Sequence, residues 1–155
     1  MLVRALISFC IALSLPSLAA AACRPDRVNI EGDFGSAWFR VAVADDPQER
    51  AQGLMFVEAM PLMEGMLFVY ERPQAASFWM RNTLIPLDML FAEADGTITR
   101  IHENAEPLNE TPIPGGDAVQ YVLEINGGLA RQIGIEEGAI LQHPAIGPEA
   151  ALPCE

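Results

Sequence analysis

The sequence predicts a small, mainly β fold, either a barrel or a sandwich of short, largely antiparallel strands with two short helices at its margin. Three observations favour this class. Several short segments alternate apolar and polar residues, turn residues separate these segments, and only two segments carry helix signals. The chain length suits one hydrophobic core, so we expect a signal peptide at 1–22 followed by a single domain at 23–155.

The first 22 residues have the three parts of a secretory signal. Residues 1–4 form a short basic start, residues 5–15 are apolar, and residues 16–22 are rich in small side chains. The apolar run is too short to cross a bilayer as a helix. We therefore expect an exported protein, periplasmic or secreted, without a membrane span.

The charge of the predicted mature chain limits its partners. Removal of the signal leaves eight arginines, no lysine and all 21 acidic residues. A chain this negative is poorly suited to nucleic acid or to anionic membrane surfaces, because both require positive charge on the protein. We expect neither partner, and we expect a monomer.

Two cysteines remain after the signal, and they lie at opposite ends of the mature chain. Because export leads to an oxidising compartment, we predict a disulfide between Cys23 and Cys154. The alternative is a lipid anchor on Cys23, since the residues before it are as small as those of a lipoprotein signal. That alternative would leave Cys154 as an odd thiol.

The first half of the mature chain predicts a strand, a helix and a second strand. Residues 37–43 alternate with a period of two. Asp46 is a good helix cap, Pro47 suits the first helical position, and Glu49 completes a capping box. This helix is expected to bury Ala51, Leu54 and Met55. A second strand is expected after it, at residues 65–70.

The middle of the chain predicts a meander. Residues 78–81 and 87–91 read as two consecutive strands, and Asp95 and Gly96 form a hairpin turn into a third strand at 97–102. The three strands are expected to pair in sequence order.

The last third begins with a long segment rich in proline and glycine, residues 104–118. It is either a lid or a solvated connection. Residues 119–125 alternate as a strand, Asn126 can cap a short helix that ends at Gly134, and residues 139–143 form the last strand.

The stretch FWMRNTLIPLD, residues 78–88, carries the main candidate site. If its two strands pair, Arg81 and Asp88 lie on one face with Trp79, and a bidentate ion pair satisfies the carboxylate. One interpretation is a polar clip that holds the strands in register, and the other is a ligand site in which Trp79 is a stacking wall. The residues of this candidate clip or site are Arg50, Trp79, Arg81, Asn82, Thr83, Asp88 and Glu124.

Two further interpretations stay open. Met60, Met63 and Met66 recur every three residues, and thioethers suit Cu(I) in exported proteins, although methionine is also common in cores. Asp88 and Glu124 would form the carboxylate pair of a hydrolase if they faced each other. Apart from Cu(I), no cofactor is predicted.

Five blocks of the sequence, in order, resemble the domain of unknown function 192 family. They are ERAQGLM (49–55), GMLF (65–68), FWMRNTLIPLD (78–88), YVLE (121–124) and GIEEG (134–138). The resemblance implies a compact, mainly β and commonly exported domain without an established activity. Val57 stands where this family is associated with an arginine. Our prediction is a non-catalytic module that binds a small molecule or a protein around residues 78–88.

Overall fold

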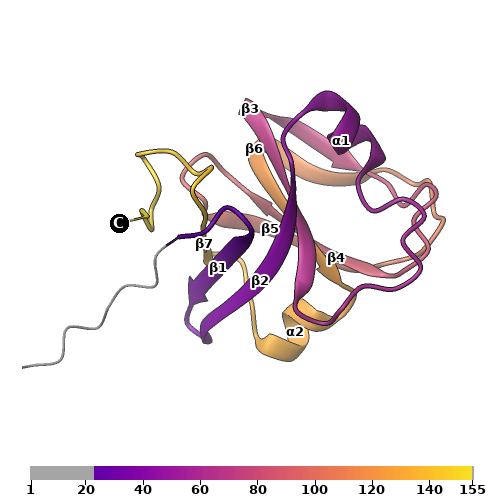
Figure 1. Cartoon of the computed structure of the whole chain (residues 1–155), viewed down its shortest axis with the longest axis horizontal. Helices are drawn as coiled ribbons and strands as arrows, with labels where there is room; N and C mark the ends of the chain where they lie inside the picture. Colours follow the sequence, from indigo (N-terminus) through magenta and orange to yellow (C-terminus); the bar gives the residue numbers. More distant parts are fainter. Residues whose placement is uncertain (1–22, 155) are drawn as a thin grey trace, which may run out of the picture.

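Seven strands form one sheet in the computed structural model, which describes residues 23–154 (Figure 1). The predicted signal peptide at 1–22 lies outside the described residues. The strands are β1 (Arg27–Gly32), β2 (Gly35–Ala44), β3 (Glu64–Phe78), β4 (Leu87–Ala92), β5 (Ile98–Ala105), β6 (Ile113–Asn126) and β7 (Ile140–Gln142). The helices are α1 (Pro47–Gln52) and α2 (Leu129–Ile133), at opposite ends of the sheet in Figure 1.

The sheet curls into a half-barrel. Its strand order is β5-β4-β6-β3-β2-β1-β7, and every neighbouring pair is antiparallel except β2 and β3. The two edges meet at one end, where Thr97 pairs with Ile140 in an isolated antiparallel bridge. The mainly β prediction with two short helices is therefore confirmed.

Alternate side chains along the strands supply two separate apolar cores. The first core cluster is centred on Phe39, Leu67, Leu90, Leu123 and Ile125, and it includes Leu129 and Ala130 of α2. The second core cluster is centred on Phe68, Met80, Met89, Phe91 and Val122, and it includes Leu54 just after α1. A substitution at consecutive positions of β4 or β6 thus affects different cores.

The predicted meander is wrong. The strand predicted at 65–70 does not end there, because β3 continues to Phe78 with register shifts after Val69. The strand predicted at 78–81 is not formed, since only Phe78 belongs to β3. Residues 79–86 then form a connection, in which Asn82 has a φ of 55° that no strand tolerates. β6 lies between β3 and β4, and only the β4–β5 hairpin is formed as predicted.

The helix α1 begins as predicted. Asp46 Oδ1 accepts hydrogen bonds from the amides of Gln48 (2.7 Å) and Glu49 (2.8 Å), and Pro47 opens the helix. It buries none of its own residues, in contrast to the prediction, since Leu54 lies beyond its end. The chain turns at Gly53, with a φ of 50°, where a Cβ would come within 3.1 Å of the Phe68 ring.

Three other elements differ from prediction. The segment 104–118 is strand at both of its ends, because β5 runs to Ala105 and β6 starts at Ile113. Residues 106–112 between these strands form the connection. Gly128 rather than Asn126 caps α2, and the Asn126 amide instead donates to the Pro61 carbonyl at 3.0 Å. The strand β1 was not predicted, although Val28 and Ile30 alternate with polar residues in it.

The disulfide prediction is confirmed. Cys23 and Cys154 are joined with a Cα–Cα distance of 5.6 Å across a sequence separation of 131 residues. The bond ties the segment before β1 to the C-terminal tail, which lie on the same side of the molecule in Figure 1. Within residues 23–154, no helix is long and apolar enough to cross a membrane.

Candidate functional site

A cleft of about 210 Å³ lies between the end of α1 and the exit of β3, over the second core cluster. We call it the Glu124 cleft. Its lining residues come from three places: the α1 end, strands β3 and β6, and the connection after β3. They are Arg50, Ala51, Gln52, Gly53, Leu54, Met55, Phe68, Tyr70, Ser77, Phe78, Trp79, Arg81, Thr83 and Glu124.

Glu124 is the one carboxyl group among these lining residues. It projects from β6 between Met66 of β3 and Met89 of β4, its register partners on the neighbouring strands. The residue is 4% exposed, and its carboxyl oxygens reach the cleft, since no buried side-chain polar atom of the described residues lacks a hydrogen-bond partner. Burial raises the pKa of the Glu124 carboxyl to about 8, so at neutral pH it is protonated and can both donate and accept a hydrogen bond.

Aromatic rings make up much of the cleft wall. The Phe68 and Phe78 rings pack edge to face with centroids 5.1 Å apart, and Phe78 continues to Phe91 at 5.7 Å. Trp79 stands at the mouth and is 45% exposed. A planar or apolar ligand body would therefore find ring edges and faces inside the cleft.

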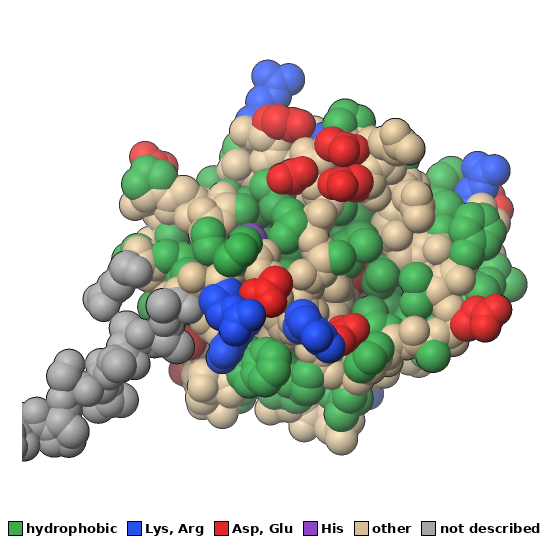
Figure 2. All heavy atoms as spheres, in the orientation of Figure 1, with side chains coloured by type: hydrophobic (Ala, Val, Ile, Leu, Met, Phe, Trp, Pro, Cys, Tyr) green, Lys and Arg blue, Asp and Glu red, His purple; other side chains and the backbone are tan. Residues whose placement is uncertain are grey.

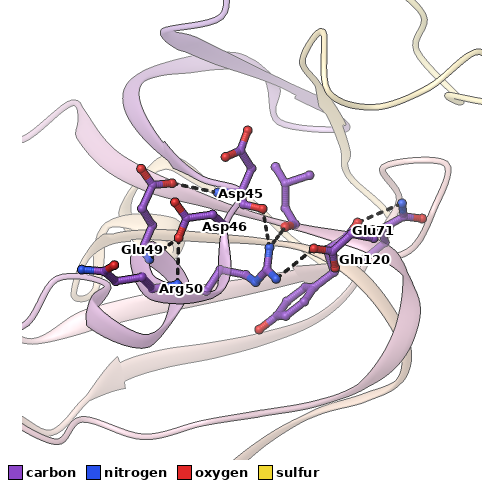
Figure 3. A network of polar contacts seen from close by, with 9 residues as sticks. Asp45, Asp46, Glu49, Arg50, Glu71 and Gln120 are labelled. Atoms are coloured by element: carbon purple, nitrogen blue, oxygen red, sulfur yellow. Dashed lines mark hydrogen bonds and ion pairs between the residues drawn. The ribbon is translucent and has the colours of Figure 1, made fainter.

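Arg50 lines the cleft, but three of its five N–H donors are already used, as Figure 3 shows. Its Nη1 donates to the Asp45 carbonyl at 2.6 Å and to the Val69 carbonyl at 2.8 Å, and its Nη2 pairs with Glu71 at 3.1 Å. The guanidinium also lies 5.0 Å from the centre of the Tyr70 ring. Arg50 thus fastens α1 to β3 and shapes the cleft.

Arg81 differs from Arg50 in having an exposed guanidinium. It lies 5.3 Å from the centre of the Trp79 ring, and among the described residues it forms no ion pair. Its neighbours shape the backbone: Thr83 Oγ1 donates to the Arg81 carbonyl at 3.3 Å, and the Asn82 carbonyl accepts from the Phe56 amide at 2.8 Å. The mouth therefore presents a cation whose donors face solvent.

Asp88 lies outside the cleft and is completely buried. Its Oδ1 accepts the amides of Asn104 and Gly128, each at 2.7 Å, and its Oδ2 accepts the amide of Ala130 at 2.8 Å. The partners are backbone amides of the β5 end and of α2, not the guanidinium groups expected from the sequence. Asp88 thus forms a polar clip that joins β4 to two other elements.

The structure does not bring Asp88 and Glu124 together. Asp88 is in register with Ile125, while Glu124 is in register with Met89, so the two carboxyl groups leave opposite faces of the sheet. The geometry of a hydrolytic carboxylate pair is therefore not formed.

The three methionines proposed for Cu(I) do not gather either. Met63 packs against the first core cluster, whereas Met60 and Met66 pack against the second. Within the described part of the chain, no group of three His, Cys, Asp or Glu side chains has the arrangement of a metal site. The methionines instead fill gaps in two cores.

A second cleft, of about 350 Å³, lies beside β1 and β2 and is lined by Trp38 and several arginines. Two of these arginines form ion pairs, Arg24 with Asp26 and Arg40 with Glu64. Figure 2 shows basic side chains beside acidic ones on this face. The guanidinium of Arg27 lies 4.5 Å from the centre of the Trp38 ring and donates to Asn29. This cleft contains no buried carboxyl group comparable to Glu124 among its lining residues.

Sequence reasoning brought Trp79, Arg81, Thr83, Arg50 and Glu124 into one candidate set, and all five line the Glu124 cleft. It missed Phe68, Tyr70 and Phe78 as lining residues. Aromatic residues in a strand give the same pattern whether they face a core or a cleft, so no local signal identified them.

Comparisons with known proteins give one family and two similar solved structures. The DUF192 family, described as "Uncharacterized ACR", matches residues 28–143. A Novosphingobium aromaticivorans protein of unknown function is 42% identical, with 79% of this chain and 93% of that chain covered and a TM-score of 0.73. A Sinorhizobium meliloti protein, described as a "putative transcription regulator", is 38% identical, with coverages of 82% and 99% and a TM-score of 0.76. The curated proteins give no match.

Proposed function

The chain belongs to the DUF192 family of uncharacterised proteins, and on that premise we propose that it is an exported, non-catalytic protein that binds a small molecule in the Glu124 cleft. The cleft volume of about 210 Å³ supports a ligand of modest size. Sites for drug-sized ligands are larger, roughly 300 to 1,000 Å³. A molecule with one ring, or a chain of similar bulk, suits this space.

The observation that carries the proposal is the carboxyl group of Glu124. No buried side-chain polar atom of the described residues is left without a hydrogen-bond partner, so the Glu124 oxygens reach the solvent of the cleft. Glu124 lies in a cleft with aromatic walls, where the hydroxyl or carbonyl group of a bound molecule would replace water as its partner. Perturbed carboxyl groups in clefts are typical of functional sites.

The chemistry of the lining residues favours binding over catalysis. No histidine is among the lining residues to activate the Ser77 or Thr83 hydroxyl, and the carboxyl group of Glu124 carries its proton in most molecules at neutral pH. Arg50 is committed to Asp45, Val69 and Glu71. The lining residues therefore lack the base and nucleophile pair of a transferase or hydrolase.

Two features support the exported part of the proposal. Residues 1–22 have the composition of a secretory signal, and a disulfide such as Cys23–Cys154 persists in oxidising compartments. The sulfur of Cys23 is used by this bond, which argues against a lipid thioether at the same atom.

Native mass spectrometry of the protein recovered from its own compartment tests this proposal, since it reports bound small molecules and oligomeric state together. We expect a monomer that carries an adduct. The adduct should be lost in Trp79→Ala and kept in Trp38→Ala, a matched control that is equally exposed but outside the cleft. An adduct that survives both substitutions equally, or no adduct at all, would contradict the proposal.

A further inference from the structure

The Glu124 cleft has one buried hydrogen-bonding group at its floor and one exposed cation at its mouth. Neither Glu124 nor Arg81 forms an ion pair within residues 23–154, and the Glu124 oxygens are open to the cleft. Both line the same cleft, so a single ligand can contact both. The two groups suggest which chemical class the ligand belongs to.

A cationic ligand is disfavoured by the occupied aromatic faces. Aromatic cages bind ammonium groups through free ring faces. Here one face of the Tyr70 ring carries the Arg50 guanidinium at 5.0 Å, and one face of the Trp79 ring carries Arg81 at 5.3 Å. An incoming cation would have to displace one guanidinium and approach the other.

An anionic group, in contrast, meets an unused guanidinium at the mouth. Arginine binds carboxylate and phosphate through charge-assisted hydrogen bonds that are shorter and stronger than neutral ones. In a chain with a net charge of −12, Arg81 is the lining arginine whose positive charge is not offset by an ion pair among the described residues, whereas Arg50 is paired with Glu71.

We infer, building on the proposed function, that the ligand is a small organic anion whose acidic group binds Arg81 and whose hydroxyl or carbonyl group binds the Glu124 carboxyl group. The ring or chain between the two groups lies against Phe68, Phe78 and Trp79. Binding then requires the proton on Glu124, because its loss places a negative charge inside the cleft opposite the anion.

The groups around Glu124 influence the pKa of its carboxyl group. Arg50 approaches from α1, Tyr70 from β3 and Arg81 from the connection after β3, while Met66 and Met89 are its apolar register neighbours. Burial raises the pKa of Glu124 to about 8. Affinity for the anion should therefore be constant from about pH 6 to pH 7 and fall about tenfold by roughly one pH unit above that pKa.

A matched set of probes tests the ligand class. The three probes are 4-(hydroxymethyl)benzoate, 4-(hydroxymethyl)benzylamine and 1,4-benzenedimethanol, which share a ring and a hydroxymethyl group and differ in charge. Isothermal titration calorimetry at neutral pH should give the benzoate about tenfold tighter binding than the dialcohol, with the amine weakest. Trp79 fluorescence in a Trp38→Phe background locates binding, since the chain has two tryptophans.

Two substitutions separate the roles of the polar groups. Arg81→Gln should remove the preference for the benzoate over the dialcohol, while Arg72→Gln, an equal charge change at an exposed site outside the cleft, should keep it. Glu124→Gln should bind the benzoate at neutral pH and lose the alkaline decline, since glutamine stays neutral. The benzoate itself stays ionised throughout.

The outcomes distinguish this inference from the proposed function. If the amine or the dialcohol binds tightest and still changes Trp79 fluorescence, the cleft binds ligands but the assignment of an anion is overturned. The same follows if benzoate affinity is unchanged across the Glu124 pKa, or if no probe binds at millimolar concentration. The adduct seen or not seen by native mass spectrometry decides the proposed function separately.

Discussion

Asp88 and Glu124 lie on neighbouring strands, β4 and β6, yet their side chains leave opposite faces of the sheet. Asp88 faces the first core cluster, where three backbone amides satisfy it. Glu124 shares the second face with Met66 and Met89 and opens into the cleft. One carboxyl group is therefore part of the scaffold and the other is available to a ligand, and their substitutions should have different consequences.

Asp88→Asn should destabilise the fold. The substitution turns one acceptor oxygen into an amide that faces an N–H donor, so at least one of the bonds to Asn104, Gly128 and Ala130 is lost in a buried site. We expect a loss of roughly 2 to 5 kcal/mol in the free energy of unfolding. Urea unfolding measures it, with Asp117→Asn as a control at an exposed position. A stable Asp88→Asn protein with impaired ligand binding would show that Asp88 is no clip.

Glu124 should make the unfolding free energy fall as pH rises. Burial raises the pKa of this carboxyl from its ordinary value of 4.5 to about 8, so the folded state holds its proton more tightly than the unfolded state does. Its stabilising contribution is complete below about pH 4.5 and is lost as pH rises to about 8. The decline amounts to a few kcal/mol at most.

The matched variant for this pH prediction is Glu124→Gln, which keeps the shape of the neutral acid and cannot ionise. The difference in unfolding free energy between variant and wild type should therefore grow in favour of glutamine from mildly acidic to alkaline pH. Chemical denaturation at several pH values gives this difference directly, while all other titrating groups cancel. A constant difference would mean that Glu124 is ionised in the folded protein at neutral pH.

Loss of the Cys23–Cys154 disulfide should lower the free energy of unfolding. The bond closes a loop of 131 residues, for which the chain-entropy model gives up to about 4 to 5 kcal/mol. A Cys23→Ser, Cys154→Ser double variant and the reduced wild-type protein should lose the same amount in denaturant titrations. If reduction leaves stability unchanged, the tail is held by contacts such as the hydrogen bond from Gln142 to the Pro153 carbonyl.

Local patterns predicted those parts of the fold that depend on local chemistry. The alternation at 37–43, the Asp46 cap and the Asp95–Gly96 turn each report a neighbourhood of a few residues, and each is present in the structure. The insertion of β6 between β3 and β4 is different, because it joins residues far apart in sequence. Period-two patterns reveal that a strand exists but not which strand it pairs with.

The sequence predicted several residues of the candidate site, but it did not predict which groups they contact or where they lie. An Asp within the apolar run 87–91 indicated a satisfied buried carboxyl group. Its partners, however, are backbone amides, which every residue except proline carries, so the side-chain types in the sequence could not identify them. Residues 78–81 alternate like a strand, yet the chain leaves β3 at Phe78 and turns through Asn82. That turn carries Trp79 and Arg81 to the mouth of the Glu124 cleft.

Trp79 and Met80 are adjacent, and their substitution by alanine should affect different properties. Met80 is 1% exposed in the second core cluster, so Met80→Ala should cost roughly 2 to 5 kcal/mol of stability. Trp79 is 45% exposed at the cleft mouth, so Trp79→Ala should change stability by about 1 kcal/mol or less and abolish ligand binding. Thermal unfolding and calorimetric binding on the same two variants measure both effects. A Trp79→Ala protein that binds as wild type while Met80→Ala does not would move the binding surface away from the Glu124 cleft.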